Sequence, residues 1–90
     1  IKHIPNEIKY LNLIELKLGI NLLDSFPNIT ELNQLKELNL SKNDIKLIPN
    51  EIENLTSLTK LNLSKCNLTT FPKTIKNLTN LTSLNLLGNK

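Results

Sequence analysis

The sequence predicts an α/β solenoid, a horseshoe segment with a parallel sheet on its concave face and short helical or irregular half-turns on its convex side. Two observations predict it. The pattern L-x-x-L-x-L-x-x-N/C-x-L returns every 22 or 23 residues, and each complete copy is followed by an apolar residue, Pro, Ile and Leu in the same order. Repeats of this length are typical of solenoids, in which each turn buries its apolar residues only against its neighbours.

The repeat pattern divides the chain into five pieces. We assign a partial repeat to residues 1–12, repeats to 13–34, 35–57 and 58–80, and a second partial repeat to 81–90. Both ends fall inside a repeat and neither carries a polar cap, so we expect these residues to belong to a longer array. Length changes fall in the second half of the repeat, where Pro27 and Ile29 are one residue closer together than Pro49 and Ile52.

The first half of each repeat is expected to form a strand. At its L-x-L step, apolar and polar residues alternate, so that Leu38 and Leu40 face the core while Asn39 faces outward. Strands that all run in one direction would form a parallel sheet with a spacing of about 4.8 Å. The outward-facing residues are then candidates for contact with a partner, or simply a solvated face whose Asn residues recur through common ancestry. The candidates are Lys36, Glu37, Asn39, Lys42, Lys60, Asn62, Lys65 and Asn85.

The Asn or Cys of the pattern is expected to have a structural role. Its side chain should point inward where the strand turns, because an Asn amide both donates and accepts and can bridge the backbones of neighbouring turns. Cys66 is the only cysteine and is expected to be a buried packing thiol. We also expect Phe26 and Phe71 to lie in the core. The ladder comprises Asn21, Asn43, Cys66 and Asn89.

Several kinds of chemistry are not encoded in the sequence. His3 is the single histidine, which argues against a zinc site, and no catalytic triad can form with it. No glycine-rich phosphate loop is present. We therefore expect no enzyme activity, no cofactor and no small-molecule substrate. The net charge is +3, but the lysines are interleaved with glutamates, which argues against nucleic acid as a partner. No apolar run approaches the ~20 residues of a membrane span.

Seven N-x-[ST] sequons leave two compartments open. In a secreted protein they would be glycan acceptors, although one ancestral copy multiplied by repetition would generate several. Secreted solenoids commonly carry disulfides, and a single cysteine cannot form one within the chain. A cytoplasmic location is therefore favoured over an extracellular one. The sequons begin at Asn28, Asn39, Asn54, Asn62, Asn67, Asn77 and Asn80.

The whole chain resembles leucine-rich repeat proteins. Its form L-x-x-L-x-L-x-x-N-x-[IL]-x-x-[IF]-P-x-x-I-x-x-L is similar to the repeat class of intracellular Ras-pathway scaffolds. The resemblance implies a non-catalytic module for protein–protein interaction that binds its partner, another protein or another domain of the same chain, on the concave face. Two alternatives stay open: a regulatory or substrate-recruiting segment of a larger signalling enzyme, and a glycosylated extracellular recognition domain.

Overall fold

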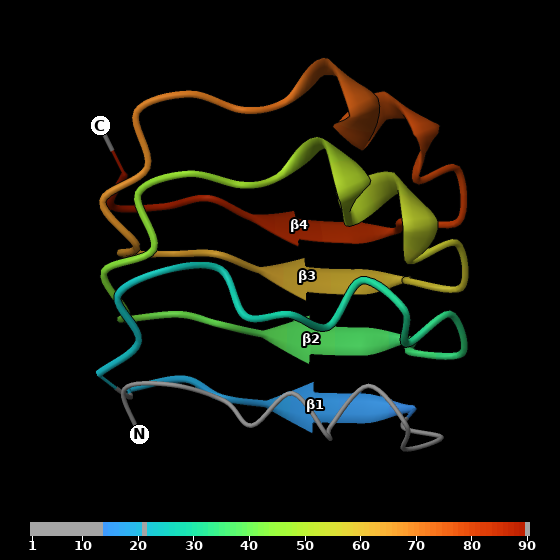
Figure 1. The fold of residues 1–90 in the computed structure, drawn as a ribbon, viewed down its shortest axis with the longest axis horizontal. Helices are drawn as coiled ribbons and strands as arrows, with labels where there is room; N and C mark the ends of the chain where they lie inside the picture. Colours follow the sequence, from blue (N-terminus) through green and yellow to red (C-terminus); the bar gives the residue numbers. More distant parts are fainter. Residues whose placement is uncertain (1–13, 21, 90) are drawn as a thin grey trace.

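The computed structural model describes residues 14–20 and 22–89. In this part of the chain, each successive turn contributes one short strand to a single parallel sheet (Figure 1). The strands are stacked in the order in which they occur in the chain, so no strand is crossed over by another. The predicted solenoid with a parallel sheet is confirmed. Its strands are β1 (Glu15–Lys17), β2 (Glu37–Asn39), β3 (Lys60–Asn62) and β4 (Ser83–Asn85).

The register of the sheet stacks equivalent residues of the repeats on one another. Leu38 of β2 pairs with Leu16 on one side and with Leu61 of β3 on the other. Leu38 and Leu61 are each only 1% exposed, as the alternation of the L-x-L step predicts. Leu84 occupies the same position in β4 but is 42% exposed, because β3 covers it on one side only.

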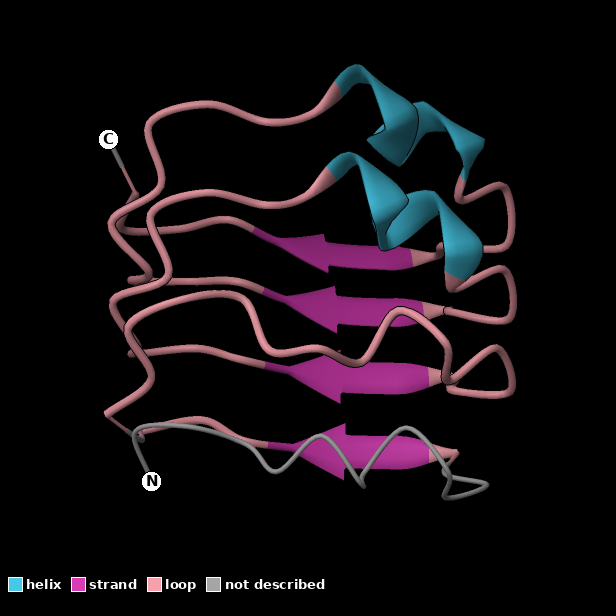
Figure 2. Ribbon diagram, viewed as in Figure 1, coloured by secondary structure: helices cyan, strands magenta, loops and turns pink. Residues whose placement is uncertain are grey.

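The convex half-turns pass in front of the strands in Figure 1, and two of them form short 3-10 helices that lie one above the other (Figure 2). These are η2 (Asn50–Asn54) and η3 (Lys73–Asn77). Each follows a proline in extended conformation, Pro49 or Pro72, whose carbonyl accepts the first hydrogen bond of the helix. Proline suits this position because it needs no backbone N–H there.

The half-turn of the preceding repeat has no such helix within residues 22–36. Here the amide of Ile29 donates directly to the carbonyl of Pro27 at 2.9 Å, whereas Ile52 reaches back three residues to Pro49. The missing residue between Pro27 and Ile29 therefore turns a helix into an irregular segment. Both geometries bury the isoleucine completely, since Ile29 and Ile52 are each 0% exposed.

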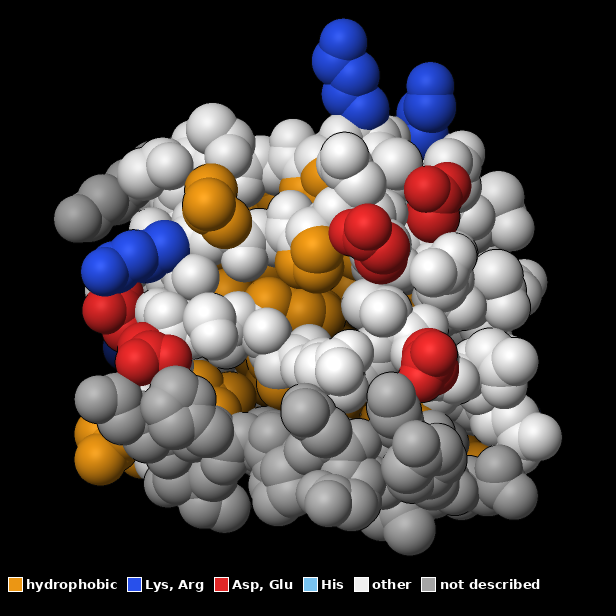
Figure 3. Space-filling view, viewed as in Figure 1, with side chains coloured by type: hydrophobic (Ala, Val, Ile, Leu, Met, Phe, Trp, Pro, Cys, Tyr) orange, Lys and Arg blue, Asp and Glu red, His pale blue; other side chains and the backbone are white. Residues whose placement is uncertain are grey.

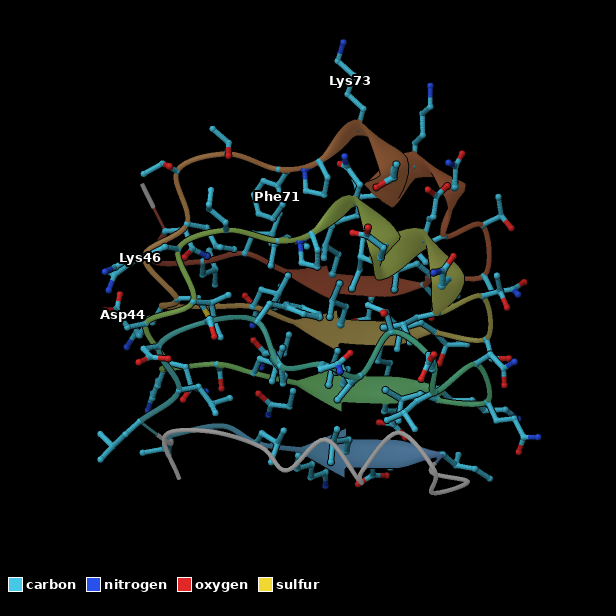
Figure 4. All side chains as sticks on the ribbon, in the orientation of Figure 1. Asp44, Lys46, Phe71 and Lys73 are labelled. Carbon is cyan, nitrogen blue, oxygen red and sulfur yellow. The ribbon has the colours of Figure 1, made fainter. Side chains whose placement is uncertain are left out.

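A single apolar cluster of stacked leucines and isoleucines fills the space between the sheet and the half-turns. Phe26 packs against this cluster while partly exposed, so its predicted core position is correct only in part. The prediction is wrong for Phe71, which is 38% exposed. Phe71 lies in the last half-turn that the structure describes (Figure 4), and no described turn follows to cover it.

Candidate functional site

Two columns of polar side chains cross the face of the sheet that is turned away from the apolar cluster. In the first column Glu37 of β2 lies opposite Lys60 of β3, and in the second Asn39 lies opposite Asn62. Alternation along each strand puts both columns on the same face, because Leu38 and Leu61 between them point into the core. We call the two columns the sheet strip. It comprises Glu15, Glu37, Lys60 and Ser83, and Lys17, Asn39, Asn62 and Asn85.

Opposite charges are paired at the β1–β3 end of the sheet strip. Lys17 Nζ lies 2.9 Å from Glu15 Oε1, and Lys60 Nζ lies 3.9 Å from Glu37 Oε1. The hydrogen bond and charge of Lys17 lower the pKa of Glu15, and Glu15 raises the pKa of Lys17 in return. The strip contains two glutamates and two lysines. It therefore carries no net charge, and its β4 end is polar and uncharged.

The asparagines of the strip have their amides held by the chain that follows each strand. Asn39 Oδ1 accepts hydrogen bonds from the backbone N–H of Ser41 at 3.0 Å and from its hydroxyl at 2.7 Å. Asn62 makes the same two bonds to Ser64, at 3.1 and 2.8 Å. Asn85 Oδ1 accepts from the N–H of Leu87 at 3.1 Å. The same turn of chain thus orients the three side chains alike.

The structure brings together five of the eight predicted contact residues. Around a depression of about 240 Å³ on the sheet face lie Glu37, Asn39, Lys60, Asn62 and Asn85. Lys17 and Ser83 line the same depression. The strand alternation predicts both on the same face, but they are not among the eight contact candidates. The register adds them, since Lys17 continues the Asn39 column and Ser83 the Glu37 column.

The three remaining candidates lie outside this depression. Lys36 is exposed at the position before β2. Lys42 and Lys65 lie beyond the ends of β2 and β3, where they line a second depression of about 430 Å³ together with Asp24 and Asp44. The second depression is therefore lined by lysines and aspartates together.

The backbone of Lys42 and Lys65 is left-handed, with φ of 59° and 55°. Gly88 holds the equivalent position of the last turn with φ of 75°. A Cβ on Gly88 would also lie only 2.8 Å from Cγ of Lys65. The turn after each strand thus requires a conformation that favours glycine, and two lysines adopt it nonetheless.

The Asn ladder lies at the end of the same turn. Asn43 is 5% exposed, and its Nδ2 donates to the carbonyls of Leu18 and Leu40, both at 2.9 Å. Its Oδ1 accepts from the N–H of Leu23 at 3.0 Å. Asn89 bonds to the preceding turn in a similar way, through the carbonyl of Leu63 and the N–H groups of Cys66 and Leu68. The predicted rung Asn21 lies outside the described residues.

In the third repeat the ladder position is occupied by Cys66 instead of an asparagine. The side chain is completely buried, and Sγ lies 3.0 Å from the carbonyl oxygen of Leu40. Burial raises the pKa of this thiol, which keeps it protonated and able to donate. A thiol offers no strong acceptor, and the N–H of Ile45 bonds instead to the backbone carbonyl of Cys66 at 3.1 Å.

The rest of the described surface carries small groups of charged side chains and an apolar patch. Across residues 14–20 and 22–89 no cluster of three or more His, Cys, Asp or Glu side chains could hold a metal ion. At the edge where the chain leaves the sheet, Asp44 and Lys46 lie together (Figure 4), with Nζ 3.4 Å from Oδ2. The side that carries the half-turns has hydrophobic side chains in its centre and lysines projecting from its upper edge (Figure 3). None of the helices in the described part of the chain has the length and apolar character to cross a membrane.

Comparison with known proteins points to one family. Residues 34–90 match the family model described as leucine rich repeat. The fold is similar to that of an LRR protein from Leptospira interrogans, with a TM-score of 0.94 and 42% identity over 99% of this chain and 23% of the other. It is also similar to the LRR ectodomain of the plant membrane receptor kinase GASSHO1/SCHENGEN3 from Arabidopsis thaliana, in complex with CASPARIAN STRIP INTEGRITY FACTOR 2. That TM-score is 0.83, with 34% identity over 98% of this chain and 11% of the other. A search of curated protein sequences found no match. The chain thus spans less than a quarter of the length of either solved relative.

Proposed function

Since the chain belongs to the leucine-rich repeat family, whose fold is generally a module for protein–protein interaction, we propose that it binds a partner protein on its concave face. The observation that carries the proposal is the sheet strip, in which side chains from all four strands surround one depression of about 240 Å³. Curved solenoids present extended surfaces of this kind to their partners. The partner is another protein or another domain of the same polypeptide.

The family's repeats are typically non-catalytic. We propose that this chain likewise contributes binding alone, as an intracellular scaffold or as the recruiting segment of a larger signalling protein. Ion pairs within the strip support a recognition role, because charges held in a fixed arrangement select partners by complementarity more than they add affinity. We expect affinity to come from many modest contacts spread over several turns.

The experiment is affinity capture from an extract of the native source with two charge-reversed variants of equal charge. One variant changes Lys17, Lys36 and Lys60 to Glu on the sheet side. The other changes Lys46, Lys73 and Lys76 to Glu at the edge and on the convex side, where Lys73 projects away from the body of the molecule (Figure 4). We expect the first variant to lose the partner and the second to keep it. Loss with the second alone would refute binding on the sheet face.

A glycosylated recognition domain is a second candidate, supported by the seven sequons. Asn28, Asn54, Asn67, Asn77 and Asn80 are exposed, whereas Asn39 and Asn62 are half-buried in the strip. Glycans at Asn39 and Asn62 would fill the depression and exclude a protein partner from it. The intact mass of the native protein distinguishes the two candidates, since a glycoprotein would show added mass that an intracellular scaffold lacks.

A further inference from the structure

We propose that the three asparagines of the sheet strip bind the carboxylate groups of an acidic peptide segment in the partner. These residues, Asn39, Asn62 and Asn85, we call the amide column. The inference rests on the proposed function and adds the chemistry of the partner to it. It depends on how the two ends of each amide are used.

The oxygen end of every amide in the column is already engaged. Asn39 Oδ1 accepts two hydrogen bonds from Ser41, Asn62 Oδ1 accepts two from Ser64, and Asn85 Oδ1 accepts one from Leu87. A carbonyl oxygen has two lone pairs, so two of the three oxygens have no further capacity. The serine hydroxyls are likewise used as donors to these oxygens.

The nitrogen end of every amide is unused by the part of the chain that the structure describes. The hydrogen bonds of Asn39, Asn62 and Asn85 all involve Oδ1, and none involves Nδ2. Some other asparagines differ, since Nδ2 of Asn67 donates to Asp44 and Nδ2 of Asn77 donates to Glu53. The amide column therefore faces a partner as a row of hydrogen-bond donors, and a partner must supply acceptors.

The spacing of the donors suits a carboxylate. The three residues are in register and identically oriented, so that corresponding Nδ2 atoms repeat at about the strand spacing of 4.8 Å. Each N–H···O bond spans about 2.9 Å, which lets the two oxygens of one carboxylate accept from two neighbouring amides. Hydrogen bonds to an ionised acceptor are roughly twice as strong as those between neutral groups. An Asp or Glu side chain therefore gains more here than a backbone carbonyl.

The surrounding charges are compatible with the same ligand, because the strip carries no net charge and the chain as a whole carries +3. Lys17 continues the amide column in β1, where it pairs with Glu15. Glu15 and Glu37 in the neighbouring column oppose an anion, but each forms an ion pair with a lysine of the strip. Lys42 and Lys65 form a weaker candidate site, because Asp24 and Asp44 line the same depression. We therefore place the carboxylate at the amide column.

The test uses isosteric changes that keep the hydrogen-bond acceptors for the following turns in place. The double variant Asn39→Asp, Asn62→Asp keeps both Oδ1 acceptors for Ser41 and Ser64, removes the Nδ2 donors and adds negative charge. The control Asn54→Asp makes the same change at the exposed end of η2. The probes are two blocked 12-residue peptides, one alternating Asp and Gly and one alternating Asn and Gly. Side-chain amide resonances in nitrogen–proton NMR spectra report where each peptide binds.

With the parent chain and with Asn54→Asp, we expect the Asp peptide to shift the amide resonances of Asn62 and Asn85. The Asn peptide should bind at least about tenfold more weakly, and the double variant should lose the shift of Asn85. Equal shifts with both peptides would overturn the carboxylate inference while leaving binding on the sheet face intact. Resonances that move with neither peptide would also overturn it. The affinity capture with the lysine variants tests the proposed function separately.

Discussion

The side chain of Asn43 donates a hydrogen bond from Nδ2 to the carbonyl oxygen of Leu18, 25 residues earlier in the chain, at 2.9 Å. The same amide accepts from the N–H of Leu23 in that earlier turn, at 3.0 Å. One buried side chain thus satisfies a donor and an acceptor of a neighbouring backbone at a place where no strand pairing can do so. The stack of turns depends on such contacts as well as on its leucines.

Replacing Asn43 by Ala should be among the more destabilising polar substitutions in this chain. It would remove the hydrogen bonds that the amide makes to the carbonyls of Leu18 and Leu40 and to the N–H of Leu23. A buried backbone group that loses its partner costs about 1–3 kcal/mol. We therefore expect a loss of about 2–5 kcal/mol in the free energy of unfolding, measured by urea titration. Asn54→Ala, at an exposed position, serves as the control. A loss below about 1 kcal/mol would show that water replaces the amide at low cost.

Cys66 occupies the Asn position of its repeat, so here the missing amide can be introduced instead of removed. We expect Cys66→Asn to raise the free energy of unfolding by up to about 1 kcal/mol, the net value of a typical hydrogen bond. The new amide could donate to the carbonyl of Leu40, which the thiol now faces, and could accept from the N–H of Ile45. Cys66→Ala, which can do neither, should lower stability in the same urea titration. A destabilised Asn variant would mean that the site cannot accommodate the larger side chain.

Replacing a stacked leucine by Ala should lower the free energy of unfolding by an amount that depends on its position in the stack of turns. Leu61→Ala should cost about 2–5 kcal/mol because a fully packed side chain leaves a cavity. Leu61 is 1% exposed, whereas Leu84 is 42% exposed at the matching position of β4. Leu84→Ala should therefore cost less than half as much in paired urea titrations. Equal costs would indicate that Leu84 is covered in solution by something other than β3.

The fold could be predicted from the sequence because the repeat itself encodes it. Leu38 and Leu61 occupy the same position in successive repeats, so each turn forms its strand at the same place. The stacking of the turns then fixes the register of the sheet. The difference between η2 and the irregular segment at Pro27–Ile29 follows from one missing residue, but the sequence alone could not say which geometry either would adopt. Phe71 was misplaced because its burial depends on a covering turn, which no local pattern reports.

The candidate site was predicted less completely than the fold. Alternation identified Asn39 and Asn62 as outward-facing, but it could not show that their oxygens bond to the serines two residues later. Lys42 and Lys65 are predicted as contact residues as well, since a sequence pattern does not report that the backbone turns left-handed after each strand. That turn carries the two lysines away from the depression on the sheet.

The buried thiol of Cys66 should react slowly with thiol reagents in the folded protein. The thiolate is the reactive form, and burial both blocks access and raises the pKa of this group, so less thiolate is present at any given pH. We expect labelling with a chromogenic disulfide at about pH 8 to be at least about tenfold slower in buffer than in strong urea. Equal rates would place Cys66 in a readily opened part of the structure.

Because the backbone of Lys65 is left-handed, replacing this residue by glycine is expected to have a different effect from a glycine elsewhere in the sheet. Glycine in a strand costs about 0.5–1 kcal/mol, and we expect that loss for Lys60→Gly at the start of β3. Lys65 instead has a φ of 55°, a conformation that costs an L-residue roughly 1–2 kcal/mol and glycine almost nothing. Relief of that strain offsets the extra flexibility that glycine gives the unfolded chain.

Lys65→Gly should therefore leave the free energy of unfolding unchanged or raise it by up to about 1 kcal/mol in urea titrations. The last turn of the chain supports this, because Gly88 occupies the equivalent position with φ of 75°. The stem of Lys65 also lies against Gly88, within 2.8 Å of where a Cβ there would sit, and truncation removes this contact. A loss as large as that of Lys60→Gly would mean that the packing of this stem over the next turn outweighs the strain in its backbone.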